Sequence, residues 1–170
     1  GGTGYVNHLN TIVEILQNNN VEIADIEDRR HPVTLDFQPI TEDYWKQQGV
    51  RWPEGHPAAG EDIILRDYQV EAINNFLENP QSLQEIATGA GKTITTATLS
   101  HIAEKYGRTL VVVPNKSLVQ QTEEDYRNCG LDCGVYFGDR KDLSKTHTIC
   151  TWQSLNILDK KSKDGTAVLT

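Results

Sequence analysis

The stretch EIATGAGKTI (residues 85–94) decides the fold of this 170-residue chain. A phosphate-binding loop follows the pattern GxxxxGK(S/T), and its end is matched here by Gly91, Lys92 and Thr93. Ile86 stands where the first glycine of that pattern is usual. The residues before the loop are predicted to be a strand, and apolar residues at helical spacing follow it. A glycine-rich loop between a strand and a helix predicts an α/β nucleotide-binding domain.

Each position of this loop has a physical task. Glycines let the backbone bring amide hydrogens toward an anion, and the N-terminus of the following helix adds partial positive charge. Lys92 brings a full charge to the outer phosphates, and the Thr93 hydroxyl is placed to bind Mg²⁺, so these two are the predicted catalytic residues. The predicted phosphate-binding residues are Thr88, Gly89, Ala90, Gly91, Lys92 and Thr93. The alternative is a plain glycine turn, which the adjacent Gly, Lys and Thr disfavour.

From Ile63 onward, strand and helix patterns alternate along the chain. The predicted strands are residues 82–87, 109–113, 131–137 and 147–150. Helices are predicted at 66–78, 94–102 and 153–158. A further helix is predicted after the strand at 109–113 and ends at about Asn128. The run TLVVV (109–113) is typical of parallel strands that are covered on both faces. Alternating units with short connections predict a mostly parallel sheet with helices on both sides.

Residues 1–60 are predicted to be an N-terminal α+β accessory region with a linker, ahead of the nucleotide-binding domain at 61–170. Apolar residues between Val6 and Leu16 recur at helical spacing, and the NNN that follows ends the helix before a short predicted strand at 21–26. The proline- and glycine-rich segment RWPEGHPAAGED is expected to be the linker.

A net charge of −8 argues against a protein whose whole surface binds nucleic acid. Residues 139–163 nevertheless hold six basic side chains (Arg140, Lys141, Lys145, Lys160, Lys161, Lys163) against three acidic ones (Asp139, Asp142, Asp159). That excess suits phosphates, although a solvated basic loop explains any single lysine in it. The sequence contains no apolar run of about 18 residues that would predict a membrane span, and we expect a cytoplasmic location.

Two further polar loops follow predicted strands, PNKS (114–117) and TWQS (151–154). Ligands of parallel sheets bind at the carboxyl ends of strands, so we expect these loops to share one edge with the glycine-rich loop. Backbone amides at the helix starts and the charge of Lys116 suit phosphate contacts with a second, extended ligand. Taken singly, each loop has a structural alternative, in which Ser117 caps its helix and Trp152 is core. A guanine-binding Asn-Lys-x-Asp motif fails at Leu118.

Four segments together resemble superfamily 2 helicases. In order and spacing, LRDYQVEAI (65–73), ATGAGKT (87–93), VVVPNKSLVQQ (111–121) and TICTWQSL (148–155) look like the adenine-reading motif, motif I, motif Ia and the strand-loop motif after it. The chain looks most like the phage UvsW-type DNA helicases, with XPB-type and type I restriction translocases as near relatives. Those families commonly lack the first loop glycine, and this chain likewise has Ile86 at that position. A phage-encoded member would lie in the cytoplasm of its bacterial host.

The resemblance implies a RecA-like domain that binds ATP and Mg²⁺. Gln69, with Arg66 nearby, would recognise adenine, while Lys92 and Thr93 engage the phosphates and Mg²⁺. The residues implied to follow the nucleic-acid backbone without reading sequence are Pro114, Asn115, Lys116, Ser117, Thr151, Trp152 and Gln153. The expected partner is DNA, branched or single-stranded, with RNA left open.

Motif II, the acidic pair that completes the Mg²⁺ site, occurs nowhere in these residues, and the acidic run at 123–125 lies in a helix instead. TAVLT (166–170) resembles the strand that should present it, so we expect the pair shortly beyond Thr170 and a second RecA-like domain after it. The isolated chain is expected not to hydrolyse ATP. Two alternatives stay open, a P-loop kinase or transferase acting on a small molecule and a non-catalytic nucleotide- or DNA-binding module.

Overall fold

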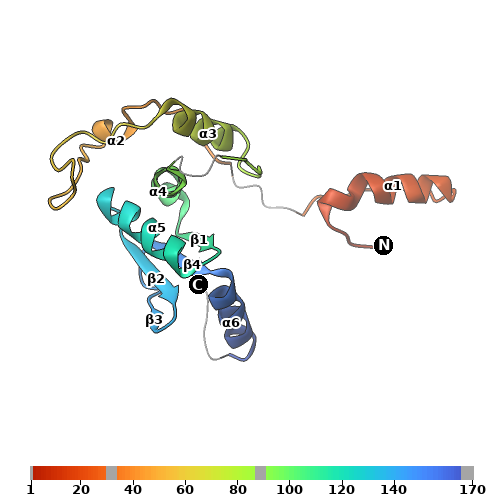
Figure 1. The fold of residues 1–170 in the computed structure, drawn as a ribbon. Coiled ribbons are helices and arrows are strands. Elements are labelled where there is room, and N and C mark those ends of the chain that lie inside the picture. The colour runs from red at the N-terminus through yellow and green to blue at the C-terminus, as the bar shows by residue number, and fades with distance from the viewer. Residues whose placement is uncertain (1, 30–33, 87–90, 166–170) are drawn as a thin grey trace. The chain divides into compact units, whose positions relative to one another are not determined.

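The computed structural model describes residues 2–29, 34–86 and 91–165, which form two compact units (Figure 1). The units are Gly1–Asp36 and Phe37–Thr170, so the division falls earlier than the boundary at residue 60 that the sequence suggested. Trp45 explains why. Its side chain is 0% exposed and belongs to the same hydrophobic core as Ile63. Among the described residues, no helix is long and apolar enough to cross a bilayer.

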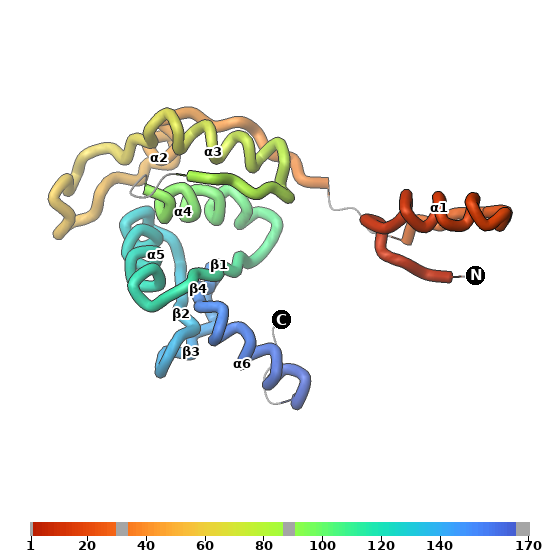
Figure 2. Tube along the Cα trace, turned by 45° about the vertical axis from the view of Figure 1, so that its right-hand side comes forward, coloured from red at the N-terminus to blue at the C-terminus, as the bar shows by residue number. Residues whose placement is uncertain are grey.

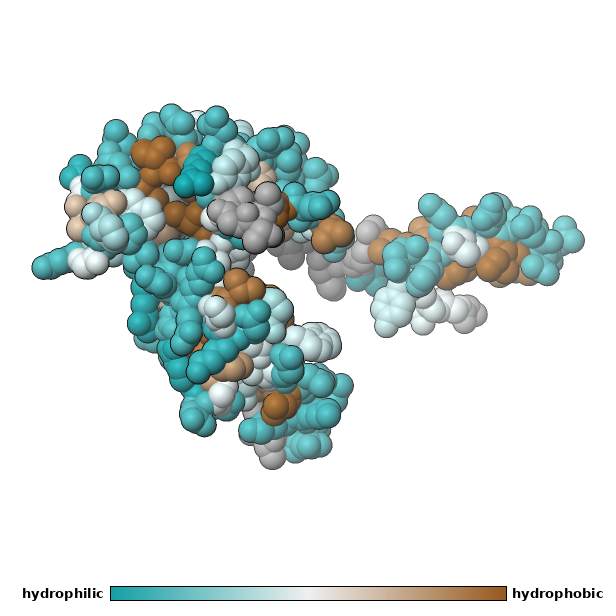
Figure 3. Space-filling view, in the orientation of Figure 1, coloured by the Kyte–Doolittle hydropathy of each residue, from teal (hydrophilic) through white to brown (hydrophobic). Residues whose placement is uncertain are grey.

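The first unit consists of a short 3₁₀ helix, η1 (Val6–His8), and the helix α1 (Leu9–Asn18). Apolar side chains of this unit are at its surface, shown in brown in Figure 3. Asn20 takes a left-handed conformation, with φ of 53°, and closes the helix. The strand predicted at 21–26 is wrong, because these residues form no ladder with any described segment. The described part of this unit is therefore helical rather than α+β.

A four-stranded sheet lies in the second unit, with the order β1-β4-β2-β3 (Figure 2). Its strands are β1 (Thr109–Val113), β2 (Cys133–Phe137), β3 (Arg140–Lys141) and β4 (His147–Thr151). β4 pairs in parallel with both β1 and β2, and only the short β3 is antiparallel to its neighbour. The prediction of a mostly parallel α/β sheet is confirmed.

Helices cover both faces of this sheet, as the alternating pattern predicted. α5 (Lys116–Asn128) contributes Val119 to one face, where it packs in the core with Ile149 of β4. α6 (Trp152–Lys163) contributes Leu158 to the other, where it packs with Cys150. Because successive side chains of a strand point to opposite faces, Ile149 and Cys150 place the two helices on opposite sides of β4.

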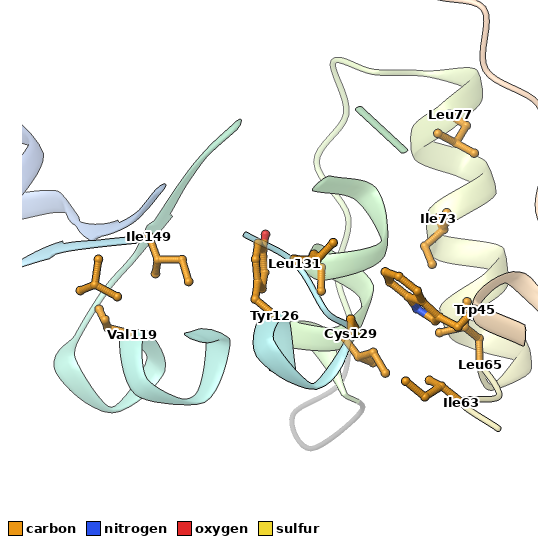
Figure 4. Close-up of a cluster of buried hydrophobic side chains, with 13 residues drawn as sticks. Trp45, Ile63, Leu65, Ile73, Leu77, Val119, Tyr126, Cys129, Leu131 and Ile149 are labelled. Carbon is orange, nitrogen blue, oxygen red and sulfur yellow. The ribbon is translucent and has the colours of Figure 1, made fainter. Parts of the chain in front are cut away.

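Three more helices complete the second unit, α2 (Tyr44–Gln47), α3 (Asp67–Glu78) and α4 (Lys92–Ala103), with the 3₁₀ helix η2 (Glu104–Tyr106) after α4. Figure 4 shows Trp45 beside Ile73 of α3. The Trp45 indole also donates to the Thr98 hydroxyl of α4, at 3.0 Å. One tryptophan therefore ties α2 to both neighbouring helices.

Two predictions about strands differ from the structure. Residues 82–86, expected as a strand, have no strand structure, and residue 87 lies outside the described residues, as does the strand expected at 166–170. β1 was expected to be covered on both faces, yet Leu110 and Val112 are 45% and 44% exposed. Val111 and Val113, on the opposite face of β1, pack against the core, so this continuous apolar run has one covered face and one open face.

Candidate functional site

The start of α4 carries the end of the glycine-rich loop. Gly91 is the N-cap of the helix and has φ of 68°, a left-handed conformation that favours glycine. Lys92 and Thr93 form the first turn, with Lys92 exposed and Thr93 buried. The predicted phosphate-binding residues Thr88, Gly89 and Ala90 lie outside the described residues.

Gln69 joins the predicted adenine-reading segment to this loop. In the first turn of α3 its side-chain carbonyl accepts the backbone N–H of Arg66 at 2.9 Å, half of a capping box. Its amide nitrogen donates to the carbonyl oxygen of Gly91 at 3.3 Å. The Arg66 guanidinium is at the surface and donates to the Tyr68 hydroxyl at 2.9 Å. The starts of α3 and α4 therefore meet, which brings three of the predicted nucleotide-binding residues together.

Asp125 of α5 is a candidate site residue that was not predicted from the sequence. The Thr93 hydroxyl donates to its carboxylate. Burial raises the pKa of Asp125, and nearby Glu124 raises it further, while the Thr93 hydrogen bond and His56 act in the opposite direction. The only signal in the sequence was the acidic run at 123–125, which helical context had removed from consideration.

Thr93 and Asp125 offer hard oxygen atoms of the kind that Mg²⁺ binds through one or two protein ligands plus phosphates. Among the described residues, no group of three or more His, Cys, Asp or Glu side chains could hold a metal by itself. The residues thus fit a cation that is shared with a nucleotide better than a cation held by protein alone. A hydroxyl that donates its hydrogen to a carboxylate keeps its lone pairs for such an ion.

The two polar loops lie side by side at the carboxyl edge of the sheet, as predicted. β1 and β4 are neighbours, and Val113 stands opposite Thr151 in their register. Asn115 caps α5, because its side-chain oxygen accepts the N–H of Leu118 at 3.0 Å. Thr151 caps α6 in the same way, accepting the N–H of Ser154 at 3.4 Å. The suggestion that Ser117 caps α5 is therefore wrong.

Most side chains of these loops are free to meet a ligand from solvent. Thr151 and Ser154 are the exceptions, since both are buried and the Thr151 hydroxyl donates to the Ser154 hydroxyl at 3.1 Å. Trp152 is 65% exposed, so the alternative that it belongs to the core is wrong. The exposed predicted contact residues are Pro114, Asn115, Lys116, Ser117, Trp152 and Gln153.

The described end of the glycine-rich loop, from Gly91 to Thr93 at the start of α4, does not share this edge. Thr93 contacts Asp125, near the end of α5, whereas Ser117 lies in the first turn of that helix. Eight residues at about 1.5 Å each separate the two positions by about 12 Å along the helix axis. The expectation of one common edge required residues 82–86 to be a strand of the sheet, and they are not.

Comparison with known proteins gives one family match, to the model described as type III restriction enzyme, res subunit, over residues 62–168. The DNA 3'-5' translocase XPB2 of Sulfurisphaera tokodaii is 33% identical over 99 residues, which are 58% of this chain and 22% of that protein. The protein named Rad25 from Haloarcula marismortui is 32% identical over 96 residues, 54% of this chain and 15% of its own length. The chain thus spans less than a quarter of the curated relatives that it matches.

Crystal structures of UvsW from bacteriophage T4 resemble the fold over 87% of this chain. One has a TM-score of 0.56 at 17% identity and is covered over 31% of its length, and the other has 0.54 at 16% identity and 54%. At this level of identity the likeness concerns the fold.

Proposed function

The chain belongs to the type III restriction enzyme res-subunit family of superfamily 2 helicases, and from this premise we propose that the whole protein is an ATP-driven translocase or helicase on DNA. The remodelling of branched DNA in recombination, repair or replication is the finer form of the proposal, and the cytoplasm is the proposed location. Residues 1–170 would supply the nucleotide-binding motifs and one set of nucleic-acid contacts.

The observation that carries this proposal is the hydrogen bond from Gln69 to the Gly91 carbonyl. One nucleotide can bind both motifs only if its base reaches Gln69 while its phosphates reach the glycine-rich loop. In the proposal, Arg66 and Gln69 face the base, and Gly91, Lys92 and Thr93 face the phosphates, together with Thr88, Gly89 and Ala90. Lys92 is exposed at the first turn of α4, as a lysine that meets a nucleotide from solvent should be.

Mg²⁺ bound with ATP would offset phosphate charge and make the terminal phosphate more reactive toward water. This chain would supply an oxygen ligand to the ion through the Thr93 hydroxyl, which the Asp125 carboxylate orients by accepting its hydrogen. The water-activating acidic pair and a second RecA-like domain are proposed to lie in the rest of the protein. Nucleic acid would cross the loops at 114–117 and 151–154, whose helix starts present backbone amides to phosphates.

ATP hydrolysis by the whole protein, with and without single-stranded, duplex and branched DNA, tests the proposal. We expect DNA to stimulate hydrolysis, Lys92→Ala to abolish it, and Lys46→Ala to leave it unchanged, because Lys46 is exposed and pairs with Asp62 at 3.4 Å, which is not one of the predicted site residues. Residues 1–170 alone should show no turnover. Hydrolysis that ignores every nucleic acid but responds to a small-molecule acceptor would favour a kinase instead.

A further inference from the structure

Trp152 is exposed to an extent that its position does not explain. It is the first residue of α6 and follows β4, in which every residue is buried. Its side chain is 65% exposed, whereas Trp45 is fully buried. Trp52 is half-buried, and its ring stacks on His56 with centroids 4.0 Å apart. The other two tryptophans of the chain are thus used in packing, and Trp152 is not.

The attachment of α6 to the sheet does not depend on the Trp152 ring. Leu158 is buried with Tyr136 and Cys150, and Leu155 packs against the same cluster. The helix start is fixed by the Thr151 hydroxyl. An indole that contributes neither to the core nor to the cap is available for a ligand.

The surroundings of Trp152 indicate what that ligand is. Val113 and Thr151 stand opposite each other at the ends of neighbouring strands, which are about 4.8 Å apart, and Pro114 and Trp152 follow them directly in the chain. The exposed Lys116 and the backbone amides at the start of α5 follow directly. An exposed aromatic ring at the start of α6 therefore shares one sheet edge with the start of α5 and an exposed cation, which is the combination that holds single-stranded nucleic acid through bases and phosphates at once.

We infer that Trp152 stacks on an unpaired base of a nucleic-acid strand that crosses the 114–117 and 151–154 loops, so that single-stranded nucleic acid is the preferred ligand of this edge. The inference rests on the proposed function and deepens it. Bases in an intact duplex are already stacked on one another, so they cannot offer a face to Trp152 without being unpaired. Stacking of one base on an aromatic ring is sequence-tolerant, and its loss lowers affinity by about 5- to 150-fold.

Two oligonucleotides of equal length separate stacking from phosphate contact, an oligothymidylate and an abasic strand with the same number of phosphates. Affinities of the full protein are measured by fluorescence anisotropy at one fixed salt concentration, for wild type, Trp152→Ala and Trp152→Phe. We expect wild type to bind the oligothymidylate about tenfold more tightly than the abasic strand. Trp152→Ala should bind both strands with the affinity that wild type has for the abasic one, and Trp152→Phe should keep most of the preference.

The outcomes distinguish this inference from the proposed function. Equal binding of both strands by wild type overturns stacking and leaves the translocase proposal standing. Equal weakening of both strands by Trp152→Ala also overturns stacking, since it would mean that the ring supports the loop or contacts another part of the protein. Failure of wild type to bind either strand also overturns the inference, and only failure to bind duplex and branched DNA as well overturns the proposed function itself. An unchanged thermal unfolding temperature of Trp152→Ala would show that its loss of affinity is not due to unfolding. Trp52→Phe is the matched control and should bind both strands with wild-type affinity.

Discussion

Replacing Gly91 by alanine tests the contact that joins the starts of α3 and α4. Gly91 has φ of 68°, a conformation that costs a residue with a side chain about 1–2 kcal/mol. A Cβ at this position would overlap the side-chain nitrogen of Gln69. Gln69 can relieve that overlap only by swinging away, which breaks its hydrogen bonds to Arg66 and Gly91.

The two costs can be added. Hydrogen bonds contribute about 0.5–1.5 kcal/mol each, so losing both costs about 1–3 kcal/mol. With the backbone strain, we expect Gly91→Ala to lower the free energy of unfolding by about 2–5 kcal/mol, measured by urea denaturation. ATP binding by the whole protein should weaken as well, because Gln69 is displaced from the position in which it would meet the base.

Gly49→Ala is the matched control. Gly49 has φ of 72°, but a Cβ there would meet nothing within 4 Å, so this variant reports backbone strain alone. In a Gln69→Ala background the overlap is gone, and Gly91→Ala should cost no more than Gly49→Ala. If Gly91→Ala and Gly49→Ala prove equally destabilising with Gln69 present, the proposed conflict between Gly91 and Gln69 does not exist.

Two further variants test the contacts of α5. Burial raises the pKa of Asp125, so the folded state holds its proton more tightly than the unfolded state, and ionisation costs stability as the pH rises through the folded pKa. Asp125→Asn should therefore be more stable than wild type at neutral pH in urea denaturation, with the advantage shrinking as the pH falls; an advantage independent of pH would contradict this. Tyr126→Phe should cost about 1–3 kcal/mol, because it leaves the buried Ser100 hydroxyl without its 2.5 Å partner, and Ser100→Ala in the same chain should recover part of that loss.

Local patterns predicted the elements of the second unit well, because burial on one face leaves a periodic trace in the sequence. α3 was predicted from Arg66 to Glu78, and the structure has it at Asp67–Glu78. β1 was predicted with its observed bounds, Thr109–Val113. The exposure of β1 could not be predicted in the same way. An apolar run has the same sequence whether helices cover one face of its strand or both, so Leu110 and Val112 gave no sign of their open face.

Trp152 marks a similar limit for the candidate site. A tryptophan can belong to the core, begin a helix or form a stacking surface, and only its position relative to α6 and β1 distinguishes these roles. The sequence placed it in the correct loop because the loop follows a strand. Its exposure depends on which face of α6 packs against Cys150, and the sequence of one loop does not contain that information.

The relation between the nucleotide loop and the nucleic-acid loops depends on one helix crossing. α5 begins at the polar loop and reaches Thr93 through Asp125 near its other end. The crossing is set by Tyr126, whose hydroxyl bonds Ser100 and reaches the Thr96 carbonyl at 3.3 Å, so the small side chains of α4 let α5 approach closely. Such a close approach leaves no periodic pattern in the sequence of either helix. Each loop could therefore be predicted from its own residues, while the separation between them, and the pairing of Thr93 with an acid 32 residues later, had to come from the structure.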